Sequence, residues 1–69
     1  MKEPTKKQMA VYRFLNDYFR RKGYAPTARE IADKFKWKSA TAARDNLTAL
    51  ARKGKIRLDD RAHRNIVII

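Results

Sequence analysis

The sequence predicts a single small domain that is mainly helical and ends in a β-hairpin. Three segments carry apolar residues at helical spacing, and each follows a residue that can cap a helix. After Gly54 the apolar residues alternate with polar ones, as they do in a half-buried strand. With 69 residues the chain can build one core over residues 1–69, but neither a second domain nor a deep catalytic pocket.

The first helix is predicted over Lys6 to Lys22. Thr5 and Gln8 have the spacing of a capping box, in which a hydroxyl and an amide satisfy free backbone N–H groups at the helix start. Gly23 can adopt the left-handed conformation that ends a helix. The apolar face between these signals is formed by Val11, Leu15, Tyr18 and Phe19.

A short connection over residues 23–27 separates this helix from a second one. Pro26 excludes helix in the connection, where a bridge of β-structure is one option. Thr27 and Glu30 form a second capping box, and the apolar residues after it predict a helix over Ala28 to Lys36.

Ser39 is a suitable N-cap for a third helix, which Gly54 ends. Ser39 also has Lys38 beside it, but no third group supports a nucleophile there, so we interpret Ser39 as a cap. The buried face of this helix is predicted to hold Ala43, Leu47, Leu50 and Ala51. The opposite face is polar and carries Thr41, Asp45, Thr48 and Arg52, with Arg44 and Ala49 beside it.

The C-terminal hairpin is predicted from two short strands, Lys55 to Leu58 and Ile66 to Ile69, joined by a polar connection. A helix, a short helix, a brief turn, a third helix and a hairpin follow the order of a winged helix-turn-helix. In that fold the second helix of the helix-turn-helix pair enters the major groove of DNA. Arg61 and Arg64 at the hairpin tip are then within reach of phosphates.

The composition narrows the function. Eighteen Lys and Arg residues against seven Asp and Glu residues give a net charge of +11 and favour a polyanionic partner, above all nucleic acid. Without Cys and with one His, the chain has no disulfide, no thiolate zinc site and no cysteine nucleophile. It shows no catalytic constellation, no Gly-rich phosphate loop and no ligand cluster, so we expect no enzyme, metal or cofactor. It also has no membrane-spanning stretch and no signal peptide, which predicts a cytoplasmic protein.

Three motifs resemble the N-terminal DNA-binding domain of LexA, the SOS-response repressor, over essentially the whole chain. They are Thr5-x-x-Gln8, Gly23-Tyr24-Ala25-Pro26-Thr27-x-x-Glu30-Ile31-Ala32 and Leu47-x-Ala49-Leu50-x-Arg52-Lys53-Gly54-x-Ile56. The resemblance implies a winged helix-turn-helix that binds duplex DNA with the start of its third helix. The positions expected to contact bases are Ser39, Thr41, Arg44, Asp45 and Thr48. The positions expected to contact the DNA backbone are Lys38, Arg52, Lys53, Arg61, His63 and Arg64.

The chain also departs from this family. LexA-like chains usually have Gly or another small residue near Lys36, and their base-contacting residues differ from Arg44 and Asp45, so the family's operator is not carried over. LexA repressors continue into a domain that dimerises and cleaves its own chain at an Ala-Gly bond. This sequence ends at Ile69 without an Ala-Gly dipeptide, so an excised domain and a free-standing small protein of bacterial or phage origin are the two options. The Met at its start favours the free-standing protein.

Three functions remain open from the sequence. The first is sequence-specific binding of duplex DNA by a transcriptional regulator, as a monomer in solution whose second copy joins it on inverted half-sites. The second is a phage- or plasmid-type interaction protein that binds an acidic host protein. The third is a non-specific or single-stranded nucleic-acid binder with Trp37 as a stacking platform, although core packing is the favoured role for Trp37.

Overall fold

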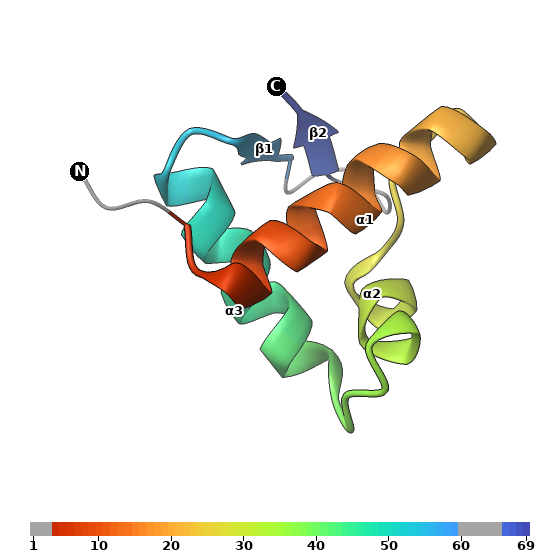
Figure 1. Cartoon of the computed structure of the whole chain (residues 1–69), viewed down its shortest axis with the longest axis vertical. Coiled ribbons are helices and arrows are strands. Elements are labelled where there is room, and N and C mark those ends of the chain that lie inside the picture. Colours follow the sequence, from red (N-terminus) through yellow and green to blue (C-terminus); the bar gives the residue numbers. More distant parts are fainter. Residues whose placement is uncertain (1–3, 60–65) are drawn as a thin grey trace.

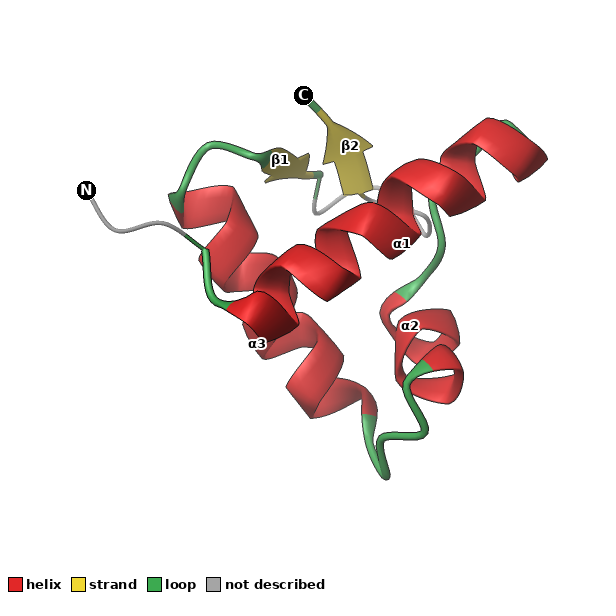
Figure 2. Cartoon of the chain, viewed as in Figure 1, coloured by secondary structure: helices red, strands yellow, loops and turns green. Residues whose placement is uncertain are grey.

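Three helices and a two-stranded antiparallel sheet make up the fold (Figures 1 and 2). The computed structural model describes residues 4–59 and 66–69. The elements in these residues are α1 (Lys6–Lys22), α2 (Ala28–Lys34), α3 (Ala40–Arg52), β1 (Ile56–Leu58) and β2 (Ile66–Ile68). The predicted fold class, mainly helical with a small hairpin, is confirmed. None of the described helices is both long and apolar enough to cross a membrane.

The helix starts match the capping signals at two of three positions. The Gln8 N–H donates to the Thr5 hydroxyl (3.1 Å), and the Gln8 side-chain oxygen accepts from the Thr5 N–H (3.0 Å). Thr27 and Glu30 make the same pair of bonds at α2, at 3.2 and 2.9 Å. Ser39 occupies the N-cap position of α3 with extended backbone, but its side chain makes no capping hydrogen bond. The prediction of a capping hydroxyl at Ser39 is therefore wrong, although the helix begins where expected.

The end of α2 differs from the prediction. The helix stops at Lys34 rather than Lys36, because Lys36 takes a left-handed backbone conformation with φ 59°. The Trp37 N–H then reaches back to the Ala32 carbonyl (2.8 Å). The connection before α2, residues 23–27, is irregular in the structure.

The core lies between the three helices and the inner face of the hairpin. Val11 and Leu15 from α1, Ile31 from α2 and Leu50 from α3 are completely buried. Among the described residues, the other buried apolar side chains are those of Ala25, Pro26, Ala32, Ala43, Leu47, Ile56 and Ile66. The predicted inner face of α3 is confirmed except that Ala51 is only partly buried. At about 25 cal/mol per Å² of apolar surface, this shared burial is the main force that holds α3 in place.

The hairpin packs on α3 through its first strand. Ile56 pairs with Ile68, Arg57 with Val67 and Leu58 with Ile66. Each strand is one residue shorter than predicted, since β1 begins at Ile56 and β2 ends at Ile68. Ile56 and Ile66 point into the core, whereas Arg57 and Val67 are exposed. The alternation of the first strand therefore orients the hairpin as the sequence predicts.

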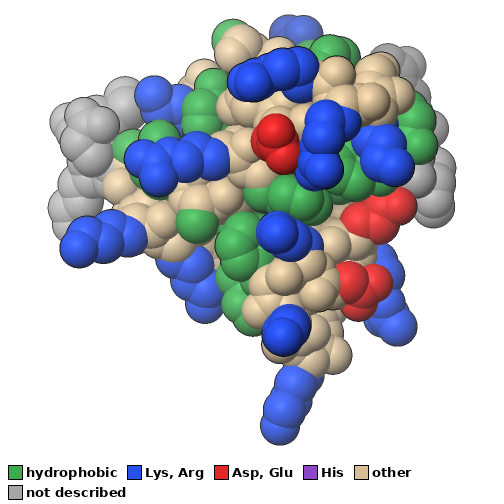
Figure 3. Space-filling view, turned by 45° about the vertical axis from the view of Figure 1, so that its right-hand side comes forward, with side chains coloured by type: hydrophobic (Ala, Val, Ile, Leu, Met, Phe, Trp, Pro, Cys, Tyr) green, Lys and Arg blue, Asp and Glu red, His purple; other side chains and the backbone are tan. Residues whose placement is uncertain are grey.

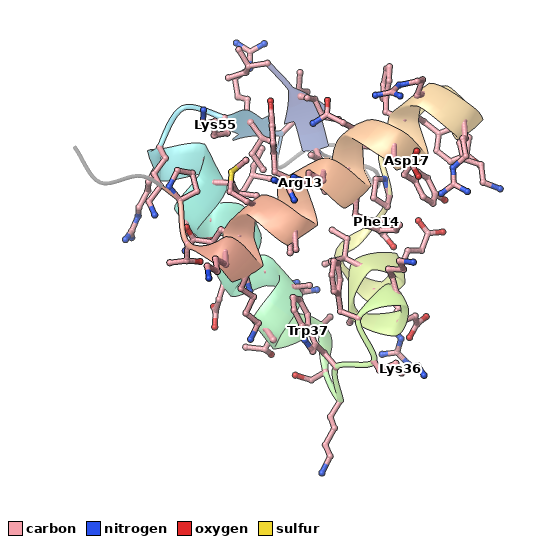
Figure 4. All side chains as sticks on the ribbon, viewed as in Figure 1. Arg13, Phe14, Asp17, Lys36, Trp37 and Lys55 are labelled. Atoms are coloured by element: carbon pink, nitrogen blue, oxygen red, sulfur yellow. The ribbon has the colours of Figure 1, made fainter. Side chains whose placement is uncertain are left out.

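A continuous row of aromatic rings runs along α1 and α2. Neighbouring rings have centroids 5.0 to 5.9 Å apart, in the order Trp37, Phe35, Phe14, Tyr18 and Tyr24. Lys7 lies over the Trp37 ring, with its ammonium 4.9 Å from the ring centroid. Figure 4 labels Phe14 and Trp37 in this row. Trp37 is half-buried and packs against the core, as its favoured interpretation predicts.

Candidate nucleic-acid interface

The outer face of α3 is the candidate site for contacts with DNA bases. Ala43, Leu47 and Leu50 turn the opposite face of α3 into the core, where α1 and α2 pack against it. The side chains left on the outer face are all exposed, and they are Thr41, Arg44, Asp45, Thr48 and Arg52. The helix thus presents two guanidinium groups, one carboxylate and two hydroxyls on its exposed face. These groups can donate to or accept from base edges in a major groove.

The start of α3 adds a second group of exposed side chains. Lys38 and Ser39 precede the helix and are both exposed. Because the Ser39 hydroxyl makes no capping bond, the first N–H groups of α3 lack this partner. An anion near this end interacts favourably with the positive end of the helix dipole. Lys38, Ser39 and Thr41 are therefore three exposed polar residues at the start of α3.

The other end of α3 is tied to α1. The Lys53 ammonium donates to the side-chain oxygen of Gln8 at 2.7 Å, and that oxygen also accepts the Thr5 N–H. The bond joins the end of α3 to the start of α1 across 45 residues of sequence. Lys53 is half-buried in this position, whereas Arg52 beside it is exposed. This contact was not predicted, because sequence analysis assigned Gln8 only to a capping box.

The hairpin contributes one described cation that the predicted set left out. Arg57 is exposed on β1, on the face of the hairpin that points away from the core. The alternation of residues 55–58 had already placed it on the solvent side. The predicted backbone contacts Arg61, His63 and Arg64 lie outside the described residues.

The charge on the protein suits a polyanion. Figure 3 shows Lys and Arg side chains spread over the visible face, with few acidic groups among them. Asp17 is held by Arg21 at 3.0 Å. In the described residues, 4–59 and 66–69, no group of three or more His, Cys, Asp or Glu side chains could hold a metal ion.

A short helix, a tight turn, a second helix with an exposed polar face and a packed hairpin together define a winged helix-turn-helix DNA-binding domain. Comparison with known protein families then identifies the family. Residues 1–65 match the family model described as the LexA DNA-binding domain, so the chain belongs to this family.

Curated relatives agree with the family assignment. The chain is 41% identical to the LexA repressors of two strains of Leptospira biflexa serovar Patoc, over 69 residues. The match covers 100% of this chain and 34% of each relative, so the chain spans about a third of their length. This membership favours DNA over an acidic host protein as the partner.

Proposed function

We propose that this chain binds duplex DNA sequence-specifically through α3 and acts as the DNA-binding part of a LexA-type repressor. The observation that carries the proposal is the exposed polar face of α3, whose opposite face is fixed in the core. A helix held in this way enters a major groove as a rigid element, which keeps its base-contacting side chains in a fixed register. Binding to the chromosome places the protein with the DNA in the cytoplasm.

Arg44 and Asp45 are the proposed main base contacts. The Arg44 guanidinium can donate two parallel hydrogen bonds to O6 and N7 of a guanine. Asp45 can accept from the amino group of a cytosine. Thr41 and Thr48 offer hydroxyls on the same face, and Ser39 offers one at the helix start.

Contacts with the DNA backbone are proposed from both ends of the exposed face of α3. Lys38 before α3 and Arg52 at its end are exposed and can reach phosphates on either side of the groove. Lys53 contributes only if its ammonium leaves Gln8, so its first role here is to hold α3 against α1. Arg61, His63 and Arg64 lie outside the described residues and stay proposed contacts with the DNA backbone.

A second copy is proposed to bind beside the first on DNA. One small module buries about 600–1,000 Å² on DNA, and specific regulators commonly double this area with a second module on an inverted half-site. We expect a monomer at micromolar concentration in solution and tighter binding to inverted half-sites than to a single one. Sedimentation of the free protein and titration of both duplexes measure these two properties.

Selection of duplexes from a random library at fixed, near-physiological salt tests the function directly. We expect one sequence to be enriched, and Arg44→Ala to cost about 1–3 kcal/mol on it, with loss of preference at one base position. Lys38→Ala is the matched control, because loss of a phosphate contact weakens selected and random duplexes alike and lowers the salt slope by about 1. Enrichment of no sequence would refute the proposal.

A further inference from the structure

The outer face of α1 carries a line of cationic side chains. These side chains do not contact the duplex that α3 is proposed to bind. Lys6, Arg13 and Arg20 are seven residues apart in the sequence. Residues at this spacing drift by only about 20° per step around a helix, so the three share one face. All three are exposed, and we refer to them as the outer stripe.

The outer stripe points away from α3. Val11 and Leu15 define the buried side of α1, and Arg13 follows Val11 by two residues, about 200° around the helix. Because α3 packs against the buried side of α1, a duplex held by the outer face of α3 lies on the far side of the protein from the stripe. Figure 1 shows α1 crossing in front of α3.

The cations of the stripe have no protein partners in the described part of the chain. Asp17 is the acidic residue of α1, and it is bound by Arg21 at 3.0 Å rather than by the stripe. Across residues 4–59 and 66–69, no ion pair or side-chain hydrogen bond involves Lys6, Arg13 or Arg20. Figure 4 labels Arg13 and Asp17, which lie one turn apart along α1.

The spacing and chemistry of the stripe fit a phosphate backbone. The stripe extends over about 20 Å of α1, so its three cations can each reach a different phosphate group. Phe19, the exposed aromatic residue of α1, lies about 100° around the helix from Arg20. The stripe itself contains no aromatic side chain, whereas the cores of protein interfaces are enriched in aromatic residues and depleted of Lys.

We propose that the outer stripe binds the phosphate backbone of a second DNA duplex, so that one molecule bridges two duplexes. The first duplex lies against α3 and is recognised by sequence, which rests on the proposed function. The second is bound without sequence preference, because cations that contact only phosphates carry no base information.

The test uses two duplexes with different fluorescent labels and the whole chain. One duplex carries the selected sequence, the other is random, and each is only long enough for one molecule. Co-diffusion of the two labels reports bridging, and sedimentation reports the mass of the complex. We expect one protein molecule with two duplexes. A complex with one duplex per molecule would overturn the proposal.

The outer-stripe variant replaces Lys6, Arg13 and Arg20 with Gln. Its matched control replaces three cations that lie over aromatic rings, Lys7→Gln, Lys22→Gln and Lys34→Gln, and so removes the same charge from another surface. Thermal melting establishes that both variants fold. The stripe variant should weaken capture of the random duplex at least tenfold and lower its salt slope by about 3, whereas the control should change capture by about twofold or less.

Two further outcomes separate this proposal from the proposed function. Equal loss of capture in both triple variants would attribute bridging to net charge and overturn the role of the stripe. Arg44→Ala should remove the preference of the first duplex at one base position and leave capture of the second duplex unchanged. If no selected duplex is bound at all, the proposed function fails, while titration of the random duplex alone still distinguishes the stripe variant from its control.

Discussion

The ends of α2 and α3 have the same backbone geometry but reach it with different residues. At the end of α2, the Trp37 N–H donates to the Ala32 carbonyl at 2.8 Å. At the end of α3, the Lys55 N–H donates to the Leu50 carbonyl at 3.0 Å in the same pattern. The residue directly before the donor has a left-handed backbone at both ends, with φ 59° at Lys36 and 77° at Gly54. Glycine adopts this conformation freely, whereas a side chain costs about 1–2 kcal/mol.

Surrounding contacts explain why the chain tolerates Lys36 in this conformation. Trp37 follows it directly and stacks on Phe35, with ring centroids 5.0 Å apart. Lys7 of α1 lies over the same Trp37 ring. The end of α3 needs no such support, because Gly54 has no Cβ that the left-handed conformation would strain. Local residue preference therefore sets the end of α3, and packing between elements sets the end of α2.

The core that α2 and α3 share should give the largest effect. Leu47 is 4% exposed, and Leu47→Ala leaves a cavity beneath α3. We expect the free energy of unfolding to fall by about 2–5 kcal/mol, measured by urea denaturation followed by circular dichroism.

Thr48→Ala is the control for Leu47→Ala, because Thr48 is the next residue and is exposed. Its effect should stay within about 0.5 kcal/mol. Similar losses in both variants would mean that α3 does not bury the face described here.

The two helix ends should respond in opposite directions to substitution. Gly54→Ala places a side chain in the left-handed region and should destabilise the protein by about 1 kcal/mol, while Lys36→Gly removes such a side chain and should stabilise it by about 0.5–1 kcal/mol. Thermal melting of both variants at one pH and salt concentration measures the pair.

Lys36→Ala separates strain from charge at the end of α2. It removes the ammonium but keeps a Cβ in the left-handed region, so it should not give the stabilisation of Lys36→Gly. An equal gain from Lys36→Ala would assign the effect to charge and leave the two helix ends without the proposed difference.

The sequence predicted those parts of the fold that depend on local signals. Helix α1 begins after Thr5 and ends before Gly23, as expected, because a hydroxyl cap and a left-handed glycine act within a few residues. The sequence placed the end of α2 two residues too late, because lysine is a good helix former and carries no stop signal. The bond between Lys53 and Gln8 was also missed, because it joins residues that only the fold brings together.

The candidate site was predicted to a similar extent. Helical periodicity placed Thr41, Asp45 and Thr48 on an exposed face, and the structure shows them there. Periodicity could not show that Ser39 leaves its hydroxyl out of the helix cap, since that depends on the path of the turn before α3.

Substitutions at the starts of α1 and α2 should have smaller effects on the free energy of unfolding. Thr27→Ala removes the hydroxyl that accepts the Glu30 N–H at 3.2 Å, and Thr5→Ala removes the corresponding group at α1. Each should lower the free energy of unfolding by about 1 kcal/mol, measured by chemical denaturation. Thr27→Ser restores a hydroxyl and serves as the control, so a loss as large as that of the alanine variant would argue against the cap.

Ser39→Ala should have the smallest effect on stability, although Ser39 occupies the same position at α3 as the two threonines at their helices. Its side chain makes no capping hydrogen bond, so its removal should change the free energy of unfolding by less than about 0.5 kcal/mol. The same variant should bind the selected duplex more weakly, because the exposed hydroxyl at the start of α3 is proposed to contact DNA. Denaturation of the free protein and titration of the duplex measure the two effects separately. A loss of stability near 1 kcal/mol would show instead that Ser39 caps α3 as Thr5 and Thr27 cap their helices.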